Sequence, residues 1–174
     1  MRRDIDVLEF ADKILQGLSK GALLTTKADG KVNTMTISWG TLGIEWNQPI
    51  FTAFVRHSRY TKTLLQENAQ FTVSIPYGQY DKNILAYCGK HSGRDVDKIT
   101  ALGLHMQDGV SVDVPAICEL ALVLECKAIY IQAQDPAAID QDTDARFYAK
   151  ASANEGDYHI AYYGQITAAY ILQD

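Results

Sequence analysis

The fold class is first indicated by residues 22–39, which read ALLTTKADGKVNTMTISW. Two strand-sized segments, Ala22–Thr26 and Val32–Trp39, flank Ala28-Asp29-Gly30-Lys31. An Asp-Gly pair between such segments is a strong hairpin signal, because the tight turn between antiparallel strands needs two residues that accept a positive φ. This stretch therefore predicts an antiparallel β-hairpin.

Further strands follow along the chain. In residues 118–130 the even positions are apolar, whereas the odd positions include Glu119, Glu125 and Lys127, which predicts one buried and one partly wet face. Gly164 predicts a bulge in the last strand. A loop is expected over Gly43–Pro49. The predicted strands are Ile50–Val55, Phe71–Ile75, Cys118–Tyr130 and Tyr158–Leu172.

Helices are short and few. Apolar residues recur at helical spacing over residues 6–20, with Asp6 and Glu9 as a capping box and Lys20-Gly21 as a stop. A short helix is expected to end near Asn68, two more lie between Asp81 and Gly103, and residues 132–157 predict a loop with a helical turn. The strands do not alternate regularly with helices. We therefore expect a single domain over residues 1–174, mainly β, built as an antiparallel barrel with peripheral helices.

Composition excludes several classes of function. Lys and Arg number 16 against 21 Asp and Glu in 174 residues, a net charge of −5, which disfavours nucleic-acid binding. The sequence contains no signal-peptide pattern, membrane-length apolar run, P-loop or dinucleotide fingerprint. Three cysteines without a Cys-x-x-Cys pair predict free thiols in a cytoplasmic protein, and the four histidines lack zinc-site spacing, so no metal is expected.

The first candidate site is Arg56-His57-Ser58-Arg59-Tyr60-Thr61, where a strand passes into a helix. The free N–H groups and dipole of a helix start favour an anion. Ser58 and Thr61 add hydroxyl donors, and Arg56 or Arg59 supplies charge-assisted bonds to a phosphate. The alternative is that Ser58 caps the helix and both arginines are solvated.

The second candidate site is residues 91–98, which read HSGRDVDK. We expect the Ser92-Gly93 turn to open a helix with Arg94 and Lys98 on one face, next to free N–H groups that suit a polyanion. The alternative is a capped surface helix with weak exposed ion pairs. Cys88 lies nearby and is the one candidate reactive thiol, although a reactive thiol needs an electropositive setting.

The third candidate site is residues 33–40, NTMTISWG, in which small polar side chains alternate with larger apolar ones. An exposed strand edge presents N–H and C=O groups to a planar heterocycle as it would to another strand. The alternative is a plain barrel strand with a hydroxylated face.

These three segments, together with residues 159–166, HIAYYGQI, resemble the flavin reductase-like, FMN-binding split-barrel family, and within it the flavoredoxin type. The resemblance extends over about residues 21–172. It implies a split β-barrel that forms a homodimer with FMN near the subunit interface. It also implies that the cofactor is bound by Asn33, Thr34, Met35, Thr36, Ile37, Ser38, Trp39, Arg56, Ser58, Arg59, Tyr60, Thr61, Ser92, Gly93, Arg94 and Lys98.

The implied function is an oxidoreductase that passes electrons from NADH, NADPH or a protein donor through FMN to an acceptor. The cofactor supplies the chemistry and the protein binds and orients it, so no catalytic side chain is predicted. Two alternatives stay open: a flavin-binding electron carrier without enzymatic activity, and a split-barrel protein with a pyridoxal phosphate-type ligand or haem.

Overall fold

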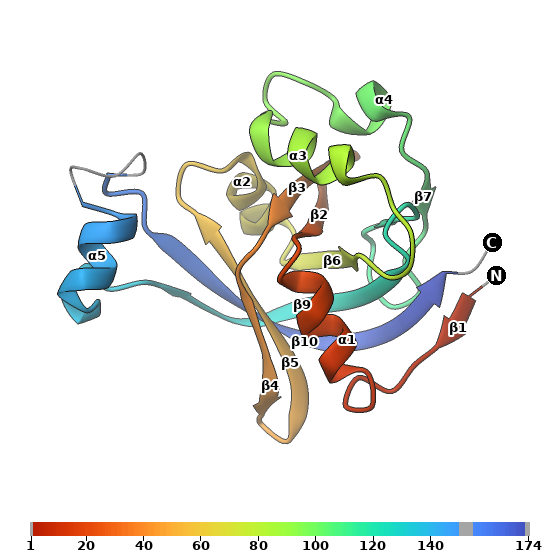
Figure 1. Cartoon of the computed structure of the whole chain (residues 1–174), viewed down its shortest axis with the longest axis horizontal. Coiled ribbons are helices and arrows are strands. Elements are labelled where there is room, and N and C mark those ends of the chain that lie inside the picture. The colour runs from red at the N-terminus through yellow and green to blue at the C-terminus, as the bar shows by residue number, and fades with distance from the viewer. Residues whose placement is uncertain (1, 150–154, 173–174) are drawn as a thin grey trace.

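The computed structural model describes residues 2–149 and 155–172, and its centre is one curved antiparallel sheet (Figure 1). The strand order is β3-β2-β6-β9-β10-β5-β4, and β1 pairs with β10 outside this path. Strands β7 and β8 form a separate two-stranded sheet, and β8 packs against β2 and β6. The strands are β1 (Arg2–Asp4), β2 (Ala22–Ala28), β3 (Lys31–Ile37), β4 (Gly40–Glu45), β5 (Gln48–Arg56), β6 (Gln70–Ile75), β7 (Met106–Gln107), β8 (Ala116–Ile117), β9 (Leu122–Ala133) and β10 (His159–Leu172).

The helices lie around this sheet, in agreement with the prediction of a mainly β domain with peripheral helices (Figure 1). Contacts place α2 on β2 and β3, and α3 and α4 on β3. The longest helix of the described chain has nine residues, so none of them is long and apolar enough to cross a membrane. The helices are α1 (Ala11–Leu18), α2 (Tyr60–Glu67), α3 (Lys82–Lys90), α4 (Lys98–Leu102), the 3-10 helix η1 (Pro136–Ala138) and α5 (Gln141–Phe147).

The β2–β3 hairpin forms as predicted. Asp29 and Gly30 occupy its turn with φ of 48° and 72°, and the register pairs Ala28 with Lys31. Two consecutive positive φ angles are typical of the tight turn that matches the twist of antiparallel strands.

The prediction of a loop over Gly43–Pro49 is wrong. Strand β4 and the start of β5 occupy this segment, joined by a second tight turn at Trp46 and Asn47, whose φ angles are 49° and 58°. Tryptophan is not among the residue types by which a tight hairpin turn is recognised in a sequence. The side chains of β4 are mostly exposed, so the strand also lacks the apolar alternation that identifies a buried one.

The predicted strand Cys118–Tyr130 begins too early. The chain turns at Cys118–Leu120, after β8, and β9 starts at Leu122. The prediction of a partly wet face is also wrong for the first half of β9, because Leu122 to Cys126 are all buried. Residues 110–111 cover this face and bind the carboxylate of Glu125.

The bulge predicted at Gly164 is confirmed. The β9–β10 register shifts between Tyr163 and Gly164. A Cβ at Gly164 would overlap Phe71 and Cys126, so the absence of a side chain lets β10 approach the core closely.

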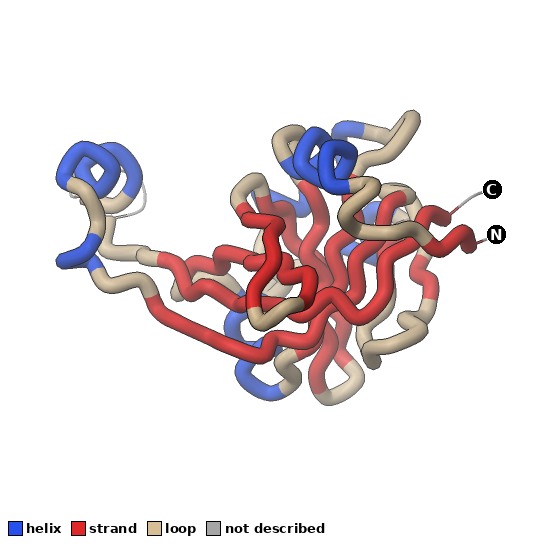
Figure 2. The backbone as a smooth tube through the Cα atoms, turned by 90° about the horizontal axis from the view of Figure 1, so that it is seen from below, coloured by secondary structure: helices blue, strands red, loops and turns tan. Residues whose placement is uncertain are grey.

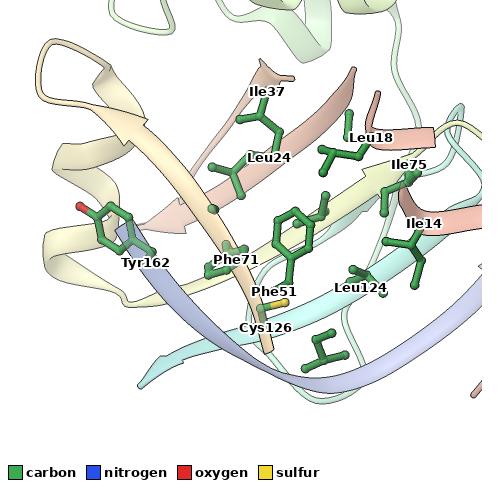
Figure 3. Close-up of a cluster of buried hydrophobic side chains, with 14 of the residues drawn as sticks. Ile14, Leu18, Leu24, Ile37, Phe51, Phe71, Ile75, Leu124, Cys126 and Tyr162 are labelled. Atoms are coloured by element: carbon green, nitrogen blue, oxygen red, sulfur yellow. The ribbon is translucent and has the colours of Figure 1, made fainter. Parts of the chain in front are cut away.

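The core fills the space enclosed by the sheet and α1 (Figure 3). Phe51, Phe71 and Cys126 pack at its centre, and Ile14 and Leu18 close it from α1. The helix is shorter than the predicted 6–20, because the Asp6 carboxylate binds the N–H groups of Leu8 and Glu9 in a separate turn and the α-helix begins only at Ala11.

The described residues of the 132–157 segment, 132–149 and 155–157, form an arm rather than a simple loop. The C-terminal half of β9 and the start of β10 extend as a ribbon that carries η1 and α5 away from the main body (Figure 2). The helical turn predicted in this segment is therefore present as α5, and residues 150–154 lie outside the described chain.

Candidate functional site

Three adjoining cavities follow β3. The aromatic cavity has a volume of about 140 Å³, the polar cavity about 140 Å³ and the outer groove about 480 Å³. The aromatic cavity is lined by Met35, Thr36, Ile37, Ser38, Trp39, Phe54, Arg56, Arg59 and His159. The polar cavity is lined by Asn33, Met35, Thr36, Ser58, Arg59, Tyr60, Thr61, Cys88, Gly89, His91, Ser92, Gly93, Arg94 and Lys98. The outer groove runs along residues 30–34 and 93–100 and includes Thr34.

Every residue that the sequence analysis assigned to the site therefore lines at least one of these cavities. Three segments far apart in the sequence meet there: β3, the β5–α2 connection and the α3–α4 connection. Met35, Thr36 and Arg59 border both the aromatic and the polar cavity, so these two are neighbours.

Strand β3 is the edge of the sheet on this side. Ala28 and Lys31 flank a two-residue turn and form a hydrogen-bonded pair, and such pairs recur at every second residue. The backbone groups of Val32, Thr34 and Thr36 consequently point away from β2. Within the described part of the chain, these N–H and C=O groups have no hydrogen-bond partner, so the predicted exposed strand edge is present beside the cavities.

The β5–α2 connection brings several donors to the polar cavity. Helix α2 begins at Tyr60, and Arg59 is its N-cap residue without a side-chain cap. Arg94 Nη1 donates to the carbonyl of Ser58 at 2.9 Å, and its guanidinium lies 5.4 Å from the centre of the Tyr60 ring. Among the described residues the guanidinium of Arg59 has neither a hydrogen bond nor an ion pair.

Ser58 does not cap α2, so that alternative is wrong. Its backbone N–H donates to Oδ1 of Asp157 at 3.0 Å, and its Oγ donates to Oδ2 at 2.6 Å. A carboxylate of the chain itself therefore takes both donors of Ser58.

Arg56 lines the aromatic cavity but not the polar one. It is only 9% exposed. Its Nη1 donates to the backbone carbonyl of Asp157 at 2.6 Å, and its guanidinium lies 5.0 Å from the centre of the Tyr148 ring and 5.8 Å from that of Trp39. The solvated state considered as an alternative for Arg56 is therefore wrong.

The prediction of one helix that carries both Arg94 and Lys98 is also wrong. Residues 92–96 form a turn in which Ser92 Oγ accepts from the N–H of Arg94. Helix α4 starts only at Lys98, because the Asp97 carboxylate accepts from two N–H groups of its first turn and Asp is a strong N-cap.

Gly93 lets this turn approach β3. A Cβ at this position would overlap the side-chain amide of Asn33, whose Nδ2 in turn donates to Thr61 Oγ1 at 3.0 Å. The glycine thus joins the turn, the edge strand and α2 around the polar cavity.

Lys98 is buried between the polar cavity and the outer groove, both of which it lines. It is 4% exposed, and its Nζ donates to the carbonyls of His91 at 3.1 Å and Cys88 at 3.4 Å. Burial lowers the pKa of this ammonium. Burial also raises the pKa of the Cys88 thiol, although Lys98 opposes that shift, so the structure does not favour Cys88 as a reactive thiol.

The sequence analysis missed His159 and Phe54 in the aromatic cavity. Burial, and next the charge of Arg56, lowers the pKa of His159 to about 4, so the imidazole is neutral near pH 7. Its Nδ1 lies 2.7 Å from the hydroxyl of Tyr148 on the arm. His159 is the Cα partner of Arg56 in the β10–β5 pair, and no sequence signal specifies this pairing.

In the described chain, no three His, Cys, Asp or Glu side chains are grouped so that they could hold a metal ion. The site is instead an edge strand flanked by cationic, hydroxyl and aromatic side chains. The fold and the site define a split-barrel-type domain whose site has an end rich in cationic and hydroxyl side chains and an aromatic end.

Comparison with known proteins agrees with this class. The family model described as "flavin reductase like domain" matches residues 19–173, so the chain belongs to that family. The chain spans about half the length of the curated relatives it matches in Archaeoglobus fulgidus and Escherichia coli.

Solved structures share the fold. A flavoredoxin from Methanosarcina acetivorans is 26% identical, with a TM-score of 0.64 over 88% of this chain and 68% of that one. An FMN-binding protein from Thermus thermophilus with bound 1-cyclohex-2-enone is 25% identical, with a TM-score of 0.62 over 86% and 68%. A putative flavin reductase from Shewanella frigidimarina, with a split barrel domain, is 15% identical, with a TM-score of 0.67 over 88% and 67%. The predicted antiparallel split barrel is confirmed.

Proposed function

We propose that the protein is an FMN-binding oxidoreductase in which the flavin phosphate occupies the polar cavity and the ring system lies along β3 into the aromatic cavity. The observation that carries this proposal is the meeting of three separate segments at one edge strand. The flavoredoxin and the FMN-binding protein reported above support a flavin as the ligand.

The donors of the polar cavity fit a phosphate. The first turn of α2 presents free backbone N–H groups, and Thr61 supplies a hydroxyl. Arg59 and Arg94 add two cations, and a guanidinium suits a phosphate because its N–H groups form paired bonds. Buried Lys98, which also lines this cavity, contributes a further positive charge. These groups can hold one terminal phosphate.

The β3 edge and the aromatic cavity fit a flat ring system. The outward backbone groups of Thr34 and Thr36 can pair with the polar edge of the ring, as a neighbouring strand would. Trp39 and Phe54 shield the ring from water, and neutral His159 adds no charge beside it. Bound FMN would supply reversible hydride and electron transfer, whereas the side chains bind and orient it.

We further propose that the protein works as a homodimer. Ile44, Trp46, Ile129, Tyr130 and Ile131 are exposed on β4, its turn and β9. Trp46 packs 6.2 Å from Tyr130 between ring centres, which joins the hairpin to the β9–β10 ribbon. Large exposed apolar side chains gathered on one hairpin and the ribbon beside it are typical of interaction surfaces.

The test is equilibrium titration of the purified protein with FMN, FAD and riboflavin, followed by anaerobic mixing with NADH or NADPH. We expect FMN to bind most tightly and to be reduced by a nicotinamide. FAD is the necessary comparison, because the outer groove of about 480 Å³ continues beyond the polar cavity and offers room for a longer nucleotide. Tighter binding of FAD would contradict the FMN assignment. Bound flavin that no nicotinamide reduces would indicate the electron carrier, and a haem spectrum would exclude flavin.

A further inference from the structure

The carboxylate of Asp157 occupies donors at the end of the site that is rich in cationic and hydroxyl side chains. Both of its oxygens accept from Ser58, one from the backbone N–H and one from the hydroxyl. The backbone carbonyl of the same residue accepts from Arg56. The side chain and the main chain of Asp157 are therefore held by two different residues of the β5–α2 segment.

The position of this carboxylate matters because Ser58 lines the polar cavity together with Arg59, Tyr60 and Thr61. Ser58 offers two further donors at the start of α2, and a phosphate that used them would lie beside a group of its own sign. Like charges repel, and the repulsion is larger where part of the surrounding water is replaced by protein. Asp157 and a bound phosphate therefore disfavour each other.

We propose that Asp157 determines ligand specificity by competing with the phosphate for Ser58, which reduces the preference of the site for FMN over riboflavin. This inference rests on the proposed function. On phosphate binding the Asp157 carboxylate releases Ser58, while the bond from Arg56 keeps the backbone in place. Riboflavin carries the same ring without the phosphate, so its affinity does not depend on this exchange.

A purely structural role for Asp157 predicts the opposite sign. If the carboxylate only holds the β5–α2 connection in its binding conformation, removing the carboxylate loosens that connection and weakens FMN binding. The two roles are therefore separated by the direction of the change in affinity.

The experiment compares Asp157→Asn and Asp157→Ala with the wild type. The Asn variant removes the charge but keeps an oxygen that can accept from Ser58. Glu155→Gln is the matched control, because it removes an equal charge only two residues from Asp157. The Glu155 side chain is exposed and has no contact with the site in the described chain. Dissociation constants for FMN and riboflavin are measured on each variant. A second readout without flavin is the rise in the thermal unfolding midpoint on adding inorganic phosphate.

We expect Asp157→Asn to bind FMN about three- to tenfold more tightly, in the range of a partly exposed charge interaction, with riboflavin and the control unchanged. Inorganic phosphate should stabilise this variant more than the wild type. Unchanged or weaker FMN binding by a folded Asn variant would overturn the proposal. If the wild type binds no flavin, the proposed function fails, and the phosphate measurement still decides whether Asp157 competes with an anion. The Asn variant settles the question if the Ala variant does not fold.

Discussion

Arg59 offers the sharpest test of the phosphate position. Its exposed side chain borders both the aromatic and the polar cavity. Because its guanidinium has no hydrogen-bond or ion-pair partner among the described residues, Arg59→Ala breaks no polar interaction of the described fold. We expect the free energy of unfolding to change by less than about 0.5 kcal/mol, as for an ordinary surface substitution. A loss of ligand affinity can then be assigned to the ligand contact itself.

The expected loss follows from the charge and exposure of Arg59. A hydrogen bond to a charged group contributes about 1.5–3 kcal/mol. Water screens an exposed guanidinium, so the lower part of that range applies, about 1.5–2 kcal/mol. This corresponds to about 10- to 30-fold weaker FMN binding.

The assay is equilibrium titration with FMN and with riboflavin, on the wild type, Arg59→Ala and Lys62→Ala. Lys62 is the matched control because it is a cation on the same helix that lines none of the three cavities. We expect a loss for FMN alone and for Arg59→Ala alone. Equal losses for both flavins would place the effect on the ring or the fold. An unchanged FMN affinity would show that Arg59 does not contact the phosphate, and the reasoning would be refuted.

Three further predictions concern the support of the site, the core and the assembly. Gly93→Ala should weaken FMN binding about tenfold by pushing the 92–96 turn from Asn33, whereas Gly43→Ala, where a Cβ meets open space, should leave the affinity unchanged; equal effects would contradict the close approach. Glu125→Gln should reduce the free energy of unfolding by about 2–3 kcal/mol in urea titrations at pH 7, because it removes a buried charged acceptor. Although burial opposes ionisation, hydrogen bonds led by that from Ser111 lower the pKa of Glu125. The ionised Glu125 carboxylate therefore stabilises the fold above its unfolded pKa of about 4.3, and this stabilisation is lost as the pH falls through the lower folded pKa. The difference in free energy of unfolding between variant and wild type should accordingly shrink in acid. A difference that stays constant with pH would show that the ionisation of Glu125 does not matter. Trp46→Arg should convert the proposed homodimer to a monomer in sedimentation equilibrium, and a wild-type monomer that holds FMN would contradict the proposed assembly.

The part of the site that sequence could predict lies in local segments. The edge strand, the Ser58–Thr61 connection and the Ser92–Arg94 turn each carry residue types suited to a flavin phosphate or ring, and the structure brings them together. Two local details were wrong. Asp97 rather than Ser92 caps α4, and Ser58 binds Asp157 instead of capping α2. Both depend on which of several competent polar groups reaches a given N–H, and that competition is decided by geometry.

The partners of these segments were beyond sequence reasoning. His159 reaches the aromatic cavity because β10 pairs with β5, and Asp157 reaches Ser58 from 99 positions away. Strand β4 escaped detection because its side chains are mostly exposed and its turn uses Trp46 and Asn47 at positive φ.

The sequence by itself determined the class of fold, the β2–β3 hairpin, the bulge at Gly164 and the three local segments that line most of the cavities. These follow from turn chemistry, alternation of apolar side chains and short motifs, all of which act between near neighbours in the chain. Only the tertiary structure decided that Asp157 lies on Ser58, that Arg56 is held between aromatic rings, and that Glu125 is buried rather than wet. Such contacts depend on strand order and on which loop covers which face, and the free energy that selects them comes from packing the whole sheet around one core.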